Sequence, residues 1–354
     1  NTAWGDGSEP VSAAKPNSPA APATDAVEQA AKTLSSGAPA ALYLKGHVLR
    51  GKGLELAGRI AAKTGCRLLA PTSNARMDRG AGRVAVERVP YVVAQALERL
   101  SPLKHLIGVG DSEPVAFFAY PDKPSRVLPD GCSVQELAAE DEDGTAALQM
   151  LCDALDANGA APELAERRSA ELPFGPLDQD KIAATVSALL PENAIVVDES
   201  VSSGRQLNWQ TAGAAPHSWL SLCGGSIGAG IPLSIGAAIA CPDRKVVDLQ
   251  ADGSAMYTIQ GLWTQAREGL DVTTIIYANR AYAILQGEMV AVGVEEPGRV
   301  ARDMFGLDRP TLDFVSMARG MGIEAERVDD AQDFVRAFQR GLATPGPYLI
   351  EAVI

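Results

Sequence analysis

Residues 246–285, VVDLQADGSAMYTIQGLWTQAREGLDVTTIIYANRAYAIL, decide the fold class of this chain. The stretch predicts an apolar strand, a turn at Asp252, a helix, and a second apolar strand that ends at Asn279. Continuous apolar strands that alternate with helices are typical of a parallel sheet with both faces covered. Asp252 and Asn279 then stand at the carboxyl ends of neighbouring strands, where such sheets bind ligands.

The same alternation covers most of the 354 residues and predicts an α/β fold with two doubly wound parallel-sheet domains. A Pro- and Ala-rich linker at 1–24 precedes a central domain at 25–158, and a second linker at 159–176 precedes a domain at 177–354. In the central domain we expect helices at 24–36 and 89–100 and a short strand at 125–130. In the last domain we expect strands at 194–200, 218–224, 245–253, 271–279, 323–328 and 347–354, and helices at 178–190, 228–240, 256–268, 311–321 and 331–342.

Charge and composition exclude several classes of partner. The net charge is −13, which argues against a nucleic-acid groove or an anionic membrane surface. The sequence has no apolar run long enough to span a bilayer and no signal peptide. Five scattered cysteines without a CxxC pair favour a reducing compartment and argue against a zinc site, so we expect a cytoplasmic protein. Because the chain begins with Asn1, we expect an upstream part that is absent here.

Four loops with unusual chemistry follow strand ends in the last domain: 198–203, 223–228, 251–254 and 279–282. The glycine-rich loop 223–228 opens a helix, and free N–H groups there suit a phosphate. Asp252 and Asn279 add oxygen ligands that suit Mg²⁺. A diphosphate held through Mg²⁺ is the simplest ligand that uses all these parts. Each part alone has a structural alternative: Asp252 as a helix cap, Asn279 as a turn residue, the glycines as packing positions.

The sequence ADG followed 27 residues later by Asn resembles the diphosphate motif of thiamine diphosphate enzymes, which is usually GDG followed by a pair of Asn. The resemblance is closest to the acetolactate synthase and benzoylformate decarboxylase group and is strong over 176–354. Residues 25–158 resemble that group's central domain more weakly. The opening TAWGDG resembles the exit from its N-terminal pyrimidine-binding domain, which is absent from this sequence. Ala251 and Ala278 depart from the motif.

The resemblance assigns roles to individual residues. Asp252 and Asn279 would bind Mg²⁺ through their side chains and Ala281 through its backbone carbonyl. The Gly225 carbonyl would contact the aminopyrimidine, Ile227 would support the bent cofactor, and Ile284 and Glu288 would face the substrate. The residues that would hold the diphosphate are Val201, Ser202, Gly253, Ser254, Tyr282 and Ala283.

The function implied is a thiamine diphosphate- and Mg²⁺-dependent 2-oxo acid decarboxylase or carboligase, acetolactate-synthase-like, with a pyruvate-type substrate. A benzoylformate-decarboxylase-like simple decarboxylase and a non-catalytic degenerate homologue stay as alternatives. The Glu that activates the cofactor belongs to the absent domain, and Glu199 is no replacement, so we expect residues 1–354 alone to be inactive on pyruvate. The central domain holds FAD in acetolactate synthases, but no residue here supports FAD. The central domain also lacks the dinucleotide-binding fingerprint that a nicotinamide dehydrogenase would need. The family builds its site between chains, which implies a homodimer or homotetramer.

Overall fold

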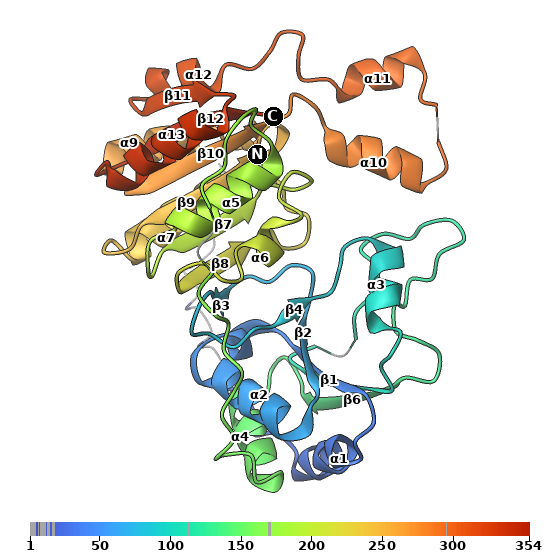
Figure 1. The fold of residues 1–354 in the computed structure, drawn as a ribbon. Helices are drawn as coiled ribbons and strands as arrows, with labels where there is room; N and C mark the ends of the chain where they lie inside the picture. The colour runs from blue at the N-terminus through green and yellow to red at the C-terminus, as the bar shows by residue number, and fades with distance from the viewer. Residues whose placement is uncertain are drawn as a thin grey trace.

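The computed structural model describes residues 5, 7, 12, 15, 18–111, 113–168, 171–294 and 296–354. Two parallel sheets, each covered by helices, lie one above the other in Figure 1. We call the part around the five-stranded sheet the central block and the part around the seven-stranded sheet the C-terminal block. The predicted α/β class with two parallel-sheet units is confirmed.

The central block is built on a sheet whose strands run in the order β4-β2-β1-β5-β6, all parallel. Its middle strand β1 is buried at every position, as its apolar sequence predicts. Helices α1, α2 and α4 contribute to the core on one face, and α3 packs on the other. The elements are α1 (Thr24–Ser35), β1 (Ala40–Leu44), η2 (Gly46–Leu49), α2 (Gly51–Thr64), β2 (Arg67–Ala70), β4 (Glu87–Arg88), α3 (Val93–Leu100), β5 (His105–Val109), β6 (Ser133–Ala138) and α4 (Gly144–Ala154).

The C-terminal block has the strand order β11-β12-β10-β9-β7-β8-β3. Helices α5 and α13 pack on one face of the sheet, and α7, α9 and α12 pack on the other. Its strands are β7 (Ile195–Glu199), β8 (His217–Ser221), β9 (Val246–Ala251), β10 (Val272–Ala278), β11 (Glu324–Val328) and β12 (Tyr348–Val353). Its helices are α5 (Gln179–Leu189), α6 (Leu207–Gln210), α7 (Gly230–Ala240), α8 (Asp252–Ala255), α9 (Gly261–Glu268), α10 (Ala283–Ala291), α11 (Arg299–Phe305), α12 (Phe314–Gly320) and α13 (Ala331–Ala343).

One strand of the C-terminal sheet comes from the central part of the chain. Strand β3 (Met77–Arg79) pairs antiparallel with β8, with Met77 opposite Trp219 and Arg79 opposite His217. Its short polar sequence gives no strand signal, and the strand exists because it adds to the exposed edge of β8. The two blocks therefore share a sheet as well as a covalent connection.

Three local predictions were wrong. Residues 125–130 do not form a strand, and the edge strand β6 (Ser133–Ala138) follows them instead. Helix α9 begins at Gly261 rather than 256, because the short helix α8 and a turn occupy the residues before it. Helix α3 begins at Val93, four residues later than expected. Within the described residues, no helix combines the length and apolar character needed to cross a membrane.

Candidate functional site

The carboxyl ends of β7, β9 and β10 lie side by side at one edge of the C-terminal sheet. Ala251 at the end of β9 is level with Tyr277 on β10, and Gln250 is level with Glu199 on β7. The predicted loops after these strands therefore meet, as expected for a parallel sheet. This edge brings together the residues around Asp252, Asn279 and Ser202.

Asp252 joins the first two of these loops. Its carboxylate is buried, and its Oδ2 accepts a hydrogen bond of 2.6 Å from the backbone N–H of Arg280, while Oδ1 accepts one of 2.8 Å from Gly253. Burial raises the pKa of Asp252 to about 6, although hydrogen bonds from Arg280 and Gly253 oppose the rise. A cation at this carboxylate would favour its ionised form.

Asn279 holds the loop after β10 in place. Its Oδ1 accepts from the N–H of Ala281 at 3.0 Å, and its Nδ2 donates to Ser203 Oγ at 3.2 Å. Arg280, between them, has a φ of +57°, a left-handed conformation that costs energy for a residue with a side chain. The turn 279–281 thus contains Asn279 and the backbone of Ala281, and the Asp252 carboxylate accepts a hydrogen bond from it.

The loop after β7 is strained at a predicted cofactor residue. Val201 has a φ of +47°, which is rare for a β-branched residue. Such conformations cost about 1–3 kcal/mol and cluster at functional sites. Ser203, two residues after Val201, has the hydroxyl that accepts from Asn279, so the strained turn contacts the loop after β10 directly. Val201 and Ser202 therefore lie next to the loop that carries Asn279.

Tyr282 packs against Gly253. A Cβ added at Gly253 would lie 2.6 Å from Tyr282 Cε1, so a larger residue would displace the ring. Ser254, in the short helix α8, is buried. Ala283 begins helix α10 directly after Tyr282. The residues predicted to hold the diphosphate after β9 and β10 are thus neighbours in the structure.

The glycine loop before α7 does not offer the free N–H groups that we expected. The Glu199 carboxylate, buried at the end of β7, accepts hydrogen bonds from the N–H groups of Gly228 and Gly230. Burial raises the pKa of Glu199, and these N–H groups oppose the rise. An internal carboxylate therefore occupies the start of α7, and the prediction of a phosphate there was wrong.

Glu199 instead fixes the shape of the loop that carries Gly225 and Ile227. Gly225 has a φ of +69°, and Ile227 stays 41% exposed on the loop surface. A Cβ added at Gly230 would lie 1.8 Å from Gln250 Nε2, so the loop approaches the sheet closely. Sequence reasoning missed this role because the partner glycines are about thirty residues away from Glu199.

The two residues predicted to face the substrate lie on α10. Ile284 is partly buried. The Glu288 carboxylate accepts hydrogen bonds from two phenols of the central block, Tyr91 at 3.0 Å and Tyr120 at 2.8 Å. Sequence reasoning did not identify either tyrosine, because their contact with Glu288 joins segments more than 160 residues apart.

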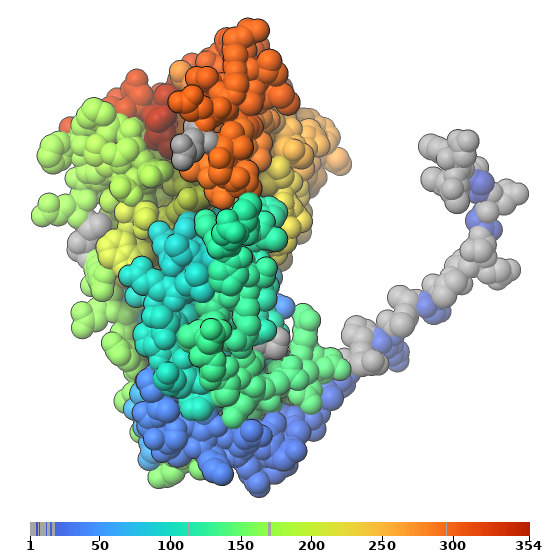
Figure 2. Space-filling model, turned by 90° about the vertical axis from the view of Figure 1, so that its right-hand side faces the viewer, coloured from blue at the N-terminus to red at the C-terminus, as the bar shows by residue number. Residues whose placement is uncertain are grey.

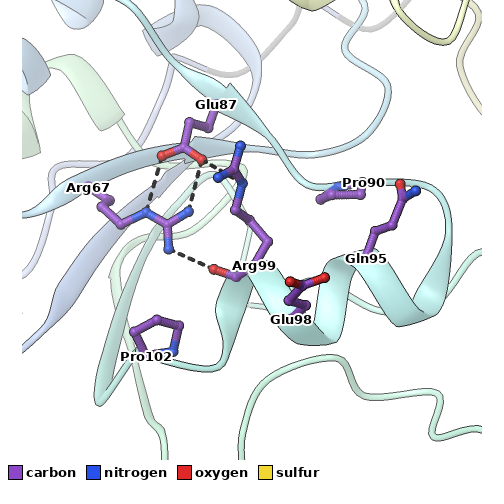
Figure 3. A pocket seen from close by; sticks show the side chains of 7 residues that line it. All are labelled: Arg67, Glu87, Pro90, Gln95, Glu98, Arg99 and Pro102. Atoms are coloured by element: carbon purple, nitrogen blue, oxygen red, sulfur yellow. Dashed lines mark hydrogen bonds and ion pairs between the residues drawn. The ribbon is translucent and has the colours of Figure 1, made fainter.

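Hollows open on the surface of the central block. One of about 270 Å³ is bounded by Tyr43, Tyr91, Phe117 and Gly224, and so reaches the glycine loop of the C-terminal block. The other, of about 550 Å³, lies beside α3 and is shown in Figure 3. There Glu87 pairs with Arg67 at 2.9 Å and with Arg99 at 3.3 Å. These charges compensate one another, and the hollow lies apart from the strand ends described above.

Comparison with known proteins shows which family this arrangement represents. Residues 204–352 match the model of the thiamine pyrophosphate enzyme C-terminal TPP-binding domain. A candidate acetolactate synthase large subunit, IlvX of Mycobacterium tuberculosis, is 47% identical over 352 residues, which are 99% of this chain and 68% of that protein. The chain belongs to the thiamine diphosphate enzyme family. The predicted likeness to the acetolactate synthase and benzoylformate decarboxylase group is confirmed.

Two further relatives of this thiamine diphosphate enzyme are decarboxylases. The benzoylformate decarboxylase of Pseudomonas aeruginosa is 35% identical over 177 residues, which are 50% of this chain and 32% of that protein. The solved thiamine diphosphate-dependent 4-hydroxybenzoylformate decarboxylase of Rhodococcus jostii RHA1 has a TM-score of 0.75 and 28% identity, and the match covers 96% of this chain and 66% of that one. This chain therefore spans at most about two thirds of the length of these relatives.

Proposed function

We propose that the protein is a thiamine diphosphate- and Mg²⁺-dependent 2-oxo acid decarboxylase or carboligase, acetolactate-synthase-like, that acts on a pyruvate-type substrate. The observation that carries the proposal is the meeting of Asp252 and Asn279 on the turn at 279–281. The 47% identity to a candidate acetolactate synthase subunit supports the choice of reaction class.

The residues present fit both the metal and the cofactor. One carboxylate, one amide oxygen and one backbone carbonyl, from Asp252, Asn279 and Ala281, are the hard oxygen donors that Mg²⁺ combines with phosphate and water. Among the described residues, no group of three His, Cys, Asp or Glu side chains forms a separate metal site. This donor set is incomplete without further oxygens, and a diphosphate would supply them.

Thiamine diphosphate, when bound, supplies an electron sink for the carbanion left as CO₂ departs from a 2-oxo acid. The chain's own residues would bind and orient it. Gly225 would accept a hydrogen bond from the aminopyrimidine, and Ile227 would support the bend between its rings. Asp252 and Asn279 would hold the metal, and Val201, Ser202, Gly253, Ser254, Tyr282 and Ala283 the diphosphate. Ile284 and Glu288, on α10, would lie on the substrate side.

A simple decarboxylase of an aromatic 2-oxo acid is the second candidate. The 270 Å³ hollow favours it, because the aromatic rings of Tyr91 and Phe117 line a space that adjoins Gly224. Ala251 and Ala278 in place of the usual motif residues favour a third reading, a non-catalytic degenerate homologue. We also propose a homodimer or homotetramer, with exposed apolar side chains of α10 and α11 such as Val290, Val300 and Met304 available for association.

Titration of thiamine diphosphate with Mg²⁺ into the full-length protein, followed by calorimetry, tests the proposal. Asp252→Ala and Asn279→Ala should weaken binding at least about tenfold, because each removes a metal ligand. Asp243→Asn, at an exposed turn before β9, is the matched control and should bind as the native protein does. Turnover with pyruvate, against turnover with benzoylformate, then separates the first candidate from the second. Absence of cofactor binding by the native protein would support the third reading and overturn the proposal.

A further inference from the structure

Helix α10 (Ala283–Ala291) leaves the C-terminal sheet without burying any of its nine residues, all of which are described. In Figure 1, α10 and α11 extend away from the sheet to one side of the block. The segment is tied at its base, where Tyr282 N–H donates to the Phe305 carbonyl at 2.8 Å and Leu307 N–H to that of Arg280 at 2.7 Å. These bonds fix the start of α10 but leave its direction undetermined.

Glu288 of α10 contacts the central block through two hydrogen bonds. One oxygen of its carboxylate accepts from Tyr91 at 3.0 Å and the other from Tyr120 at 2.8 Å. Figure 2 shows the orange segment that contains α10 resting on the teal and green surface of the central block. Two hydrogen bonds to one side chain fix its direction better than one, so this pair can orient a helix that has no buried side chain.

The two phenols are themselves held by an aromatic cluster. The ring of Tyr91 lies 5.8 Å from that of Phe117, Phe117 lies 4.8 Å from Phe118, and Phe118 lies 6.4 Å from Tyr120. The guanidinium of Arg205, from the C-terminal block, lies 5.8 Å from the centre of the Tyr91 ring. Such ring–ring and cation–ring contacts are favourable and limit the freedom of the phenols.

This cluster also touches the predicted aminopyrimidine loop. A Cβ added at Gly225 would lie 3.1 Å from Phe117 Cζ, so the Phe117 ring stands against the loop. Burial, together with the hydrogen bonds to Glu288, raises the pKa of both Tyr91 and Tyr120. Both phenols therefore remain protonated donors at neutral pH.

We propose that Tyr91 and Tyr120 are positioning residues, which hold α10 through Glu288 and thereby set the place of Ile284 on the substrate side of the cofactor site. Each oxygen of Glu288 accepts one hydrogen bond in this contact, so Glu288 links the two phenols to the helix that carries Ile284. The substrate part of the inference rests on the proposed function. The contact itself does not.

Hydrogen exchange of the full-length protein tests the contact without any need for activity. The double variant Tyr91→Phe/Tyr120→Phe and the variant Glu288→Ala should each increase exchange of the α10 amides about tenfold, because both remove the same two hydrogen bonds. Glu288→Gln keeps an acceptor and should give an intermediate rate. Glu296→Gln, an exposed residue just beyond the same helix, makes the same charge change and should have no effect. Unchanged exchange in the double variant would overturn the proposal.

Kinetics of the cofactor-loaded enzyme test the positioning role. The double variant should raise the KM for the 2-oxo acid at least about fivefold, while the dissociation constant of thiamine diphosphate and the melting temperature stay close to native values. A purely structural role would move the melting temperature and leave KM unchanged, which would contradict the inference. If the native protein binds no cofactor, the proposed function fails, and the exchange result still decides whether the contact holds α10.

Discussion

Asp248 is a buried carboxylate in the middle of β9 that the cofactor site does not use. Its Oδ1 accepts from Gln250 Nε2 at 2.8 Å and its Oδ2 from Thr274 Oγ1 at 3.5 Å, and it is fully buried. Burial raises the pKa of Asp248 to about 7, and the nearby Glu199 carboxylate contributes to this rise. An unfolded Asp titrates near 3.8. Between these values the folded protein holds a proton that the unfolded chain has lost.

Stability should therefore fall as the pH rises from about 4 to about 7 and should change little from this group above that range. Asp248→Asn keeps the shape and the acceptor for Gln250 but removes the ionisation. At pH 8 we expect this variant to exceed the native protein by on the order of 2–4 kcal/mol in free energy of unfolding, and at pH 4 to be no more stable. Urea unfolding at both pH values measures this, with Asp243→Asn as the exposed control. An equal difference at both pH values would contradict the prediction.

Single residues also show where sequence reasoning reached its limit. Asp252 and Asn279 could be predicted as neighbours, because the two strands of one strand–helix–strand unit are usually adjacent in a parallel sheet. The role of Glu199 in capping α7, and the contact of Tyr91 with Glu288, could not be predicted. They depend on how distant segments approach in space, and neither residue type nor local spacing marks them.

Among the elements, Arg327 and Glu351 couple β11, β12 and α12. Arg327 on β11 forms two bonds to the buried Glu351 carboxylate of β12, at 2.9 and 3.0 Å. The second oxygen of Glu351 also accepts from the N–H of Val315 in α12 at 3.3 Å. The Glu351 side chain is only 1% exposed and loses its hydration, whereas the Arg327 side chain is 44% exposed and keeps part of its own.

Arg327→Ala should leave the Glu351 carboxylate buried without its cation. Breaking a buried pair in this way costs about 3–5 kcal/mol, and the exposure of Arg327 reduces the expected loss to about 2–3 kcal/mol. Arg336→Ala, which breaks a surface pair with Asp333 on α13, should cost less than about 1 kcal/mol. Guanidinium unfolding of both variants gives the comparison, and equal losses would show that Glu351 finds another partner or water.

Elements were predictable in proportion to their own apolar content. Strands β9, β10 and β12 match the expected ranges closely, because almost every position in them is buried. Helices α10 and α11 bury no residue, and neither is among the helix ranges predicted for the last domain. Strands β3 and β4 have three and two residues and depend on pairing with neighbours rather than on their own sequence.

At the scale of the whole molecule, β3 joins the central block to the C-terminal sheet. Arg79, at its end, is buried, with its guanidinium 4.7 Å from the centre of the Trp219 ring and a hydrogen bond of 3.3 Å to Thr211. One cluster of buried apolar residues includes Met77 on β3, Trp219 on β8 and side chains from both blocks. A continuous core of this kind favours one cooperative unfolding transition.

Gly80, directly after β3, offers a test of this coupling. It has a φ of +94°, and an added Cβ would lie 2.4 Å from the backbone oxygen of Ala215, which cannot rotate away. Gly82 also has a positive φ, +74°, but an added Cβ there meets nothing within 4 Å. Gly82→Ala should therefore show the cost of the backbone conformation alone, about 1–2 kcal/mol, whereas Gly80→Ala adds a clash that forces β3 away from β8.

Calorimetry of the full-length protein distinguishes the two variants. Gly80→Ala should lower stability by about 3 kcal/mol or more and separate the unfolding of the two blocks, so that the calorimetric enthalpy exceeds the van't Hoff enthalpy. Gly82→Ala should keep the ratio of calorimetric to van't Hoff enthalpy that the native protein has. If both variants lose the same stability and keep that ratio, β3 does not couple the blocks, and their common unfolding would have to come from the linker and the helices between the sheets.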